Sequence, residues 1–268
     1  MTGHILLGYE PTAAGERALA WAVDEARLRG LALAVGPVLH RPSPSRPEGA
    51  SGEPADAAVH RAGEAAAGVR VTAAPGRLVD AAPTAALIVL GRPAPDALTG
   101  SEVEHLLGTA GTAPVIVVPP DSAATGDRIV VGVDGSPASR TALELAFTEA
   151  GLRAAAVTAV CGWWSVPGPG REGRPFTEDD RERRIAETRF AEEIAPWAAR
   201  RPKVAVDRVF VTEPPQDALL RRSAGAVLLV LGDHGLGTAP AERFGPVTRT
   251  VLAAATCPVA VTRAPHPH

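Results

Sequence analysis

Two short segments in the second half of the chain place carboxylates, hydroxyls and glycines directly after apolar runs. The first segment covers 132–137 and reads Gly-Val-Asp-Gly-Ser-Pro. The Asp134 carboxylate stands at the end of a strand-like run, where it can accept hydrogen bonds from the hydroxyl groups of a ribose. The same residues also suit a structural task, in which Asp134 and Ser136 shape the turn and cap the following helix. The sequence leaves both interpretations open.

The second segment is rich in glycine. Gly232 is followed after two residues by Gly235 and after nine more by Gly245, and Thr248 lies three positions further on. Glycines let a backbone approach phosphate oxygens closely, and the N–H groups at a helix start favour anions. Because glycines after a strand are common, the spacing is what points to a phosphate site. His234 lies inside this segment, where it either contacts a phosphate or faces solvent.

The elements that carry these residues belong to an internal repeat. Segments 4–10, 18–22, 87–91 and 112–115 resemble segments 128–134, 142–146, 228–232 and 256–259, in the same order. The separation between the paired segments grows from 124 to 144 residues along the chain. This order indicates a duplicated domain whose second copy is longer in its middle. We therefore predict one domain at 1–120 and another at 127–264, joined by a linker rich in turn formers.

Within each copy, short apolar runs alternate with helix-like stretches. The runs of the second copy cover 129–133, 156–161, 204–211, 227–231 and 258–262. Continuous runs of Val, Leu and Ile are typical of strands that are buried on both faces. The intervening stretches predict helices at 137–150, with Ser136 as its cap, and at 177–200. In the first copy, the matching stretch at 41–54 predicts a surface loop.

This alternation predicts the fold class α/β, with two tandem doubly wound domains and mostly parallel sheets. In such sheets, ligands bind outside the carboxyl ends of the strands, near the point where the strand order reverses. Both chemistry-bearing segments follow strands at that edge.

At these residues the chain resembles the universal stress protein family in its tandem two-domain form. The resemblance rests on 130–136, on the glycine spacing and on the Cys-Pro-Val of 257–259, and it covers nearly the whole chain. It implies Rossmann-like domains with five-stranded sheets. Many members of the family bind ATP through the glycine pattern. It also implies that the last strands of the two copies, at 115–118 and 259–262, pair across an internal pseudo-twofold axis. Whether the paired chain forms a further homodimer stays open.

The resemblance assigns roles to six residues of the second domain. Asp134 would meet the ribose and adenine side of the nucleotide, and Gly162, just past the second strand, would lie by the adenine. The phosphates would be cradled by Gly232, Gly235 and Gly245, with Thr248 nearby. The resemblance leaves open whether Mg²⁺ accompanies the nucleotide.

The chain departs from the family pattern at both nucleotide sites. In the second domain, Pro246 stands where the family has Ser or Thr, which removes an N–H and a hydroxyl donor. In the first domain, Glu10 takes the place of the aspartate and Ala94 takes the place of the second glycine. The loop from there to Gly100 is also shorter by four residues. We therefore expect ATP in the second domain alone.

No catalytic or metal-binding pattern stands out. Ser136 lacks the Gly-x-Ser-x-Gly surroundings of a hydrolase nucleophile, and the seven histidines show no metal-ligand spacing. We predict a stress or signalling protein that binds an adenine nucleotide without robust catalysis, and no enzyme. The alternatives are a nucleotide-free interaction or dimerisation scaffold and, third, a weak ATPase or adenylating enzyme.

Composition sets the outer limits of these interpretations. Hydrophobic residues make up 46% and charged residues 21%, with a formal net charge of -3, which is the balance of a globular chain and not of a general nucleic-acid binder. No apolar run approaches the roughly 18 residues of a membrane span, and we expect a cytoplasmic protein with no membrane partner. Cys161 and Cys257 are predicted to be buried free thiols, with a redox pair as the alternative.

Overall fold

The computed structural model describes residues 3–38, 55–92, 105–106, 111, 113–122, 126–163, 176–236 and 244–264. Its first half contains β1 (His4–Tyr9), α1 (Ala13–Arg29), β2 (Ala32–Pro37), α2 (Ala55–Ala65), β3 (Val71–Ala73), α3 (Leu78–Ala81), the 3₁₀ turn η1 (Ala82–Thr84), β4 (Ala85–Gly91) and β5 (Val115–Val118). Its second half contains β6 (Arg128–Gly132), α5 (Pro137–Arg153), β7 (Ala156–Gly162), α6 (Phe176–Arg200), β8 (Val206–Val211), α7 (Pro215–Ser223), β9 (Leu228–Gly232), α8 (Pro246–Ala254) and β10 (Val259–Thr262).

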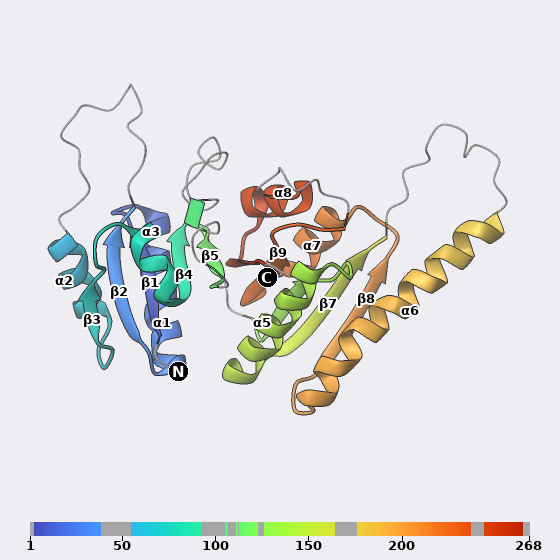
Figure 1. Ribbon diagram of the computed structural model, residues 1–268, viewed down its shortest axis with the longest axis horizontal. Helices are drawn as coiled ribbons and strands as arrows, with labels where there is room; N and C mark the ends of the chain where they lie inside the picture. The colour runs from blue at the N-terminus through green and yellow to red at the C-terminus, as the bar shows by residue number, and fades with distance from the viewer. Residues whose placement is uncertain are drawn as a thin grey trace, which may run out of the picture.

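The described strands form one ten-stranded sheet in the order β3-β2-β1-β4-β5-β10-β9-β6-β7-β8 (Figure 1). Neighbours within each half are parallel, and β5 pairs antiparallel with β10 at the centre, with Val117 opposite Val259. The strand pairing expected between 115–118 and 259–262 is therefore present. The mostly parallel α/β fold predicted from the sequence is confirmed.

Helices cover both faces of the sheet. Alternate strand residues point to opposite faces, so that Leu7 and Val131 belong to one core and Leu6 and Val130 to the other. Residues of α1, α2, α5 and α6 fill the first core, and residues of α3, α7 and α8 fill the second. Each half is thus doubly wound, which explains why its strands read as continuous apolar runs.

The first helix of each half begins in the same way. The Thr12 hydroxyl accepts a hydrogen bond from the N–H of Gly15 at 3.0 Å, and the Ser136 hydroxyl accepts one from Ser139 at 3.1 Å. Pro137 follows at the first turn of α5, as its fixed φ allows. These caps fix where each helix leaves the carboxyl edge of the sheet.

The last turns of α1 and α5 meet in a buried group of four charged residues, the quartet, made of Glu25, Arg29, Glu149 and Arg153. Each arginine pairs with the glutamate of its own helix and with the glutamate of the other helix. Both glutamate side chains are fully buried. The Arg153 guanidinium also lies 5.6 Å from the ring centroid of Trp21. The quartet joins the two halves beside the β5–β10 pair.

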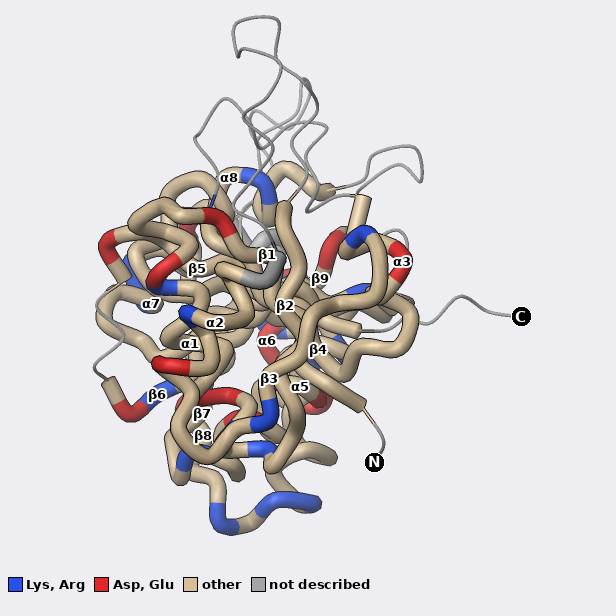
Figure 2. The backbone as a smooth tube through the Cα atoms, turned by 90° about the vertical axis from the view of Figure 1, so that its left-hand side faces the viewer, with Lys and Arg blue, Asp and Glu red and all other residues tan. Residues whose placement is uncertain are grey.

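Some sequence predictions lie outside the described residues. These are the surface loop at 41–54, the Ala94 and Gly100 part of the first-half loop, and the middle of the glycine segment at 237–243. In the view of Figure 2, acidic and basic stretches are interspersed along the described chain. None of the helices in the described ranges is long and apolar enough to span a membrane.

Candidate functional site

The candidate site lies where β6 and β9 end side by side. The chain leaves β6 through α5 toward one side of the sheet and leaves β9 through α8 toward the other, so the strand order reverses between these two strands. This point is where doubly wound sheets bind ligands. Asp134 follows β6, and the glycine segment follows β9.

Asp134 holds the turn and the glycine segment together. Its carboxylate accepts a hydrogen bond from the N–H of Ser136 at 2.9 Å through Oδ1 and one from the N–H of Leu236 at 3.2 Å through Oδ2. The residue is nevertheless exposed. The turn-shaping interpretation therefore applies in this structure, and the carboxylate also faces solvent, from which a ligand hydroxyl can reach it.

Ser136 makes a second tie to the same segment. Besides capping α5, its hydroxyl donates a hydrogen bond to the backbone carbonyl of His234 at 3.4 Å. The start of α5 and the start of the glycine segment are thus linked at two points. These two hydrogen bonds hold residues 234–236 beside the start of α5.

Two of the predicted site glycines are required by packing. A Cβ on Gly232 would lie 2.7 Å from the Cβ of Ala138, and a Cβ on Gly162 would lie 2.6 Å from the Cα of Pro215. The first half repeats the first contact, because a Cβ on Gly91 would lie 2.7 Å from the carbonyl carbon of Ala14. These glycines let a helix start approach the end of a strand.

The other two predicted site glycines, Gly235 and Gly245, lie in the glycine segment itself. Gly235 is exposed, and a Cβ there would lie 2.6 Å from Oδ2 of Asp134. Gly245 precedes the first turn of α8, and its N–H donates to the carbonyl of Asp233 at 2.8 Å. The two glycines therefore flank the segment whose middle lies outside the described residues.

Thr248 fastens α8 to the end of β9. Its side chain is buried, and its hydroxyl donates a hydrogen bond to the carbonyl of Gly232 at 2.8 Å. Pro246 is exposed at the first position of the helix and carries no N–H. The structure thus gives the Thr248 hydroxyl a partner inside the protein.

Two charged residues at this edge were not singled out by the sequence analysis. Asp233 is 3% exposed, and its Oδ2 accepts a hydrogen bond from Nε of Arg263 at 2.9 Å. The Nδ1 atom of His234 lies 3.1 Å from the same oxygen. Asp233 could have been singled out from the sequence, because it is a carboxylate that directly follows an apolar run and lies between glycines. Nothing in the sequence points to Arg263, because its position depends on how β10 pairs.

The site brings Asp134, Gly232, Gly235, Gly245 and Thr248 to one edge. Gly162 ends the neighbouring strand β7, where it packs against the start of α7. The N–H of Val133 bonds to the carbonyl of Val160, which keeps the ends of β6 and β7 together.

The thiols have no part in this arrangement. Cys161 is half-buried in β7, Cys257 is buried just before β10, and both are free. β9 and β6 lie between β10 and β7 in the sheet. Burial raises the pKa of each thiol to about 11, and the Asp134 carboxylate adds to the effect at Cys161. Thiols with such pKa values are poor nucleophiles near neutral pH. Within the described ranges, no three or more His, Cys, Asp or Glu residues group as metal ligands would.

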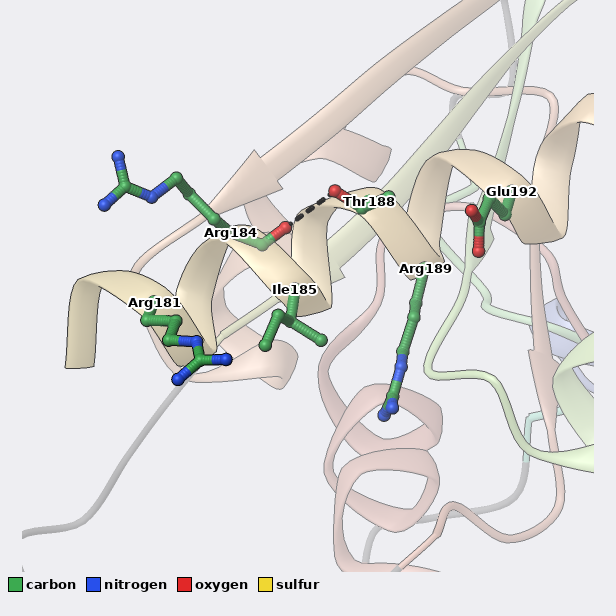
Figure 3. Close-up of a pocket in the computed structure, with 6 residues that line it drawn as sticks. All are labelled: Arg181, Arg184, Ile185, Thr188, Arg189 and Glu192. Carbon is green, nitrogen blue, oxygen red and sulfur yellow. Dashed lines mark hydrogen bonds between the residues drawn. The ribbon is translucent and has the colours of Figure 1, made fainter. Parts of the chain in front are cut away.

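A shallow hollow on α6 is a weaker candidate (Figure 3). It is lined by Arg181, Arg184, Ile185, Thr188, Arg189 and Glu192. All six residues come from one helix, and the Thr188 hydroxyl bonds within that helix to the Arg184 carbonyl at 2.9 Å. Since no second element lines the hollow, it cannot enclose a small ligand.

Comparison with known proteins gives a consistent result. Residues 126–263 match the model of the universal stress protein family. The chain is 37% identical over 194 residues to universal stress protein Rv2005c of Mycobacterium tuberculosis, across 69% of this chain and 64% of that protein. It is 30% identical over 287 residues to a universal stress protein of Mycolicibacterium smegmatis, across 97% of this chain and 96% of the relative.

The alignment thus spans less than two thirds of the first relative's length. Among solved structures, a universal stress protein from Archaeoglobus fulgidus aligns with a TM-score of 0.64 at 17% identity, across 98% of this chain and 96% of that chain. This last likeness concerns the fold.

Proposed function

Because the chain belongs to the universal stress protein family, we propose that its second half binds ATP or a related adenine nucleotide and acts as a stress protein without robust catalysis. One observation carries the proposal. The reversal point between β6 and β9 brings Asp134 and the glycine segment together, and hydrogen bonds from Leu236 and Ser136 join them. This is the edge at which a doubly wound sheet takes a nucleotide.

In this proposal, the ribose hydroxyls donate to the exposed carboxylate of Asp134, and Gly162 lies toward the adenine. The phosphates lie along Gly235 and Gly245, where the first turn of α8 presents N–H groups to an anion. Gly232 and Thr248 support them by holding α8 against β9. Both oxygens of Asp134 accept backbone N–H groups, so a Mg²⁺ ion would be held mainly by the nucleotide.

We further propose two domains, at 1–120 and 127–264, with the nucleotide in the second alone. The position that holds Asp233 in the second half holds Arg92 in the first half. The Arg92 guanidinium donates a hydrogen bond to the carbonyl of Ala255, at the end of α8 in the second half, at 2.6 Å. The first half then serves the second half as a structural partner. A cytoplasmic location belongs to the same proposal, because free thiols fit a reducing compartment.

Calorimetric titration of the full chain with ATP tests the proposal. We expect one nucleotide per chain, and we expect Gly235→Ala to weaken binding at least tenfold, because its Cβ would displace the Asp134 carboxylate. Gly63→Ala is the matched control, since a Cβ at Gly63 meets nothing within 4 Å. Two nucleotides per chain would contradict the asymmetry.

The scaffold function is the second candidate, and Pro246 favours it, because a donor is missing at the first turn of α8. No binding of ATP or adenosine by a folded chain would favour that function. Conversion of ATP during long incubation, measured by separation of the nucleotides, would instead favour a weak ATPase or adenylating enzyme.

A further inference from the structure

The helix that starts at the proposed phosphate site, α8, is held at both of its ends. Near its start, the Thr248 hydroxyl donates a hydrogen bond to the carbonyl of Gly232 at 2.8 Å. At its other end, the Arg92 guanidinium donates one to the carbonyl of Ala255 at 2.6 Å. The first of these contacts is made within the second half, whereas the other reaches α8 from the first half.

The contacts at its ends matter because α8 is short. It has nine residues, and its buried side chains are those of Thr248, Val251 and Leu252. The last carbonyls of a helix have no partner inside the helix, so the carbonyl of Ala255 needs a donor from elsewhere. Because α8 makes only about two and a half turns, a displacement of its last residue also displaces its first turn.

The central strand pairing brings Arg92 to this helix. Arg92 follows β4, and its N–H donates to the carbonyl of Val118, at the end of β5, at 2.7 Å. Because β5 and β10 are antiparallel, the end of β5 lies beside the start of β10, which the chain enters from α8. The backbone of Arg92 is therefore fixed in the first half, while its side chain reaches the second half.

The contact runs in one direction only. The residue of the second half at the position of Arg92 is Asp233, whose carboxylate accepts a hydrogen bond from Nε of Arg263, in the same half, at 2.9 Å. An ionised carboxylate has no hydrogen to donate to a carbonyl at a helix end. At this position, only the residue of the first half can hold a helix of the other half in this way.

We propose that Arg92 is a positioning residue for the phosphate end of the nucleotide site. The inference rests on the proposed function and gives the first half a task in it. In that function, the N–H groups at the start of α8 meet the phosphates. Arg92 fixes the place of these groups from the far end of the helix, without contacting the ligand. Because linked equilibria are reciprocal, a bound phosphate also strengthens this contact between the halves.

Calorimetric titration of the full chain with ATP and with adenosine tests the role of Arg92. Arg92→Met keeps an unbranched side chain and removes the donors. Arg27→Met is the matched control, because Arg27 of the same half donates to the carbonyls of Ala65 and Ala67 at the end of α2, which packs on the other face of the sheet from α8.

We expect Arg92→Met to weaken ATP binding about fivefold or more and to leave adenosine binding unchanged. Arg27→Met should change neither. Arg92→Lys keeps a donor, so it should recover part of the lost ATP affinity.

Hydrogen exchange in the chain without nucleotide separates this role from simple capping of the helix end. Loss of the Arg92 guanidinium should speed exchange in the last turn of α8, where the N–H of Ala255 bonds to the carbonyl of Val251 at 2.9 Å. If Arg92 positions the whole helix, exchange also rises at its start, where the N–H of Arg249 bonds to the carbonyl of Gly245 at 3.0 Å. Faster exchange in the last turn alone would overturn the inference.

The titrations can overturn the inference in three further ways. Equal ATP affinities of Arg92→Met and the natural chain would overturn it and leave the nucleotide site standing. Equal losses for ATP and adenosine would do so as well, because the whole site and not its phosphate end would then have loosened. A matching loss in Arg27→Met would show that Arg92 has no special place. No ATP binding by the folded natural chain would instead overturn the proposed function, and this role of Arg92 with it.

Discussion

At the scale of single residues, the glycine pattern mixes two physical requirements. Gly232 and Gly91 occupy the same place in the two halves, and each lets a helix start approach the end of a strand. This need belongs to the fold and would persist without a ligand. Gly235 differs, because a side chain there would collide with the Asp134 carboxylate at the exposed edge. In the proposed function, the glycines that would bear on a ligand are therefore Gly235 and Gly245.

Pro246 offers the sharpest residue-scale test of the proposed phosphate site. It is exposed at the first position of α8, so serine fits there and restores an N–H and a hydroxyl at a helix start. We expect Pro246→Ser to strengthen ATP binding by about 1–3 kcal/mol, or about five- to a hundredfold, in calorimetric titration. The gain should be smaller for adenosine, which has no phosphate.

Equal and tight ATP binding by both chains would mean that other groups already satisfy the phosphates. If neither the natural chain nor Pro246→Ser binds ATP, the scaffold function is favoured, because the family residue at this position would not have restored nucleotide binding.

At the scale of elements, the sequence predicts the strands well because they are buried on both faces. The five strands of the second half begin and end within two residues of the apolar runs at 129–133, 156–161, 204–211, 227–231 and 258–262. The start of α5 was also predictable, since Ser136 and Pro137 carry a local signal. The contacts of Asp233 were not, because its partner Arg263 is 30 residues away and reaches it through the pairing of β9 with β10.

The attachment of α8 to β9 gives an element-scale prediction. The Thr248 hydroxyl bonds to the carbonyl of Gly232 in a buried setting, so Thr248→Val leaves that carbonyl without its donor. We expect a loss of about 1–3 kcal/mol in the free energy of unfolding, measured with urea, together with weaker ATP binding. Thr248→Ser keeps the hydroxyl and should retain most of both properties. Equal losses for valine and serine would show that the methyl group, and not the hydrogen bond, holds the helix.

At the scale of the whole molecule, the two halves meet through residues at corresponding positions. Glu25 and Arg29 of α1 correspond to Glu149 and Arg153 of α5, each 124 residues later, and together they form the buried quartet. Because both halves present the same pair of charges, each glutamate meets both arginines. The apolar strands β5 and β10 pair beside them and cover each other's edges. The quartet itself was not predicted, since nothing in the sequence says that the last turns of α1 and α5 meet.

The quartet leads to a prediction about stability and pH. Burial, together with the neighbouring Glu25 carboxylate, raises the pKa of Glu149 from 4.5 to about 7, against the opposing effect of Arg153 and Arg29. A folded-state pKa above the unfolded value means that the folded chain holds the proton more tightly. This contribution to stability is therefore fully present below about pH 4.5 and is lost as the pH rises through about 7. We expect it to amount to about 1–3 kcal/mol.

The measurement is the free energy of urea unfolding between pH 5 and pH 8 for the natural chain and for Glu149→Gln. Glutamine cannot ionise, so the difference between the two chains isolates the titration of this carboxyl from the acid response of all other groups. We expect the natural chain to lose stability relative to Glu149→Gln as the pH rises, with most of the change complete by about pH 8. A difference that does not vary with pH would mean that the two arginines keep Glu149 ionised throughout. In that case, the joint between the halves would be a fixed ion pair with no response to pH.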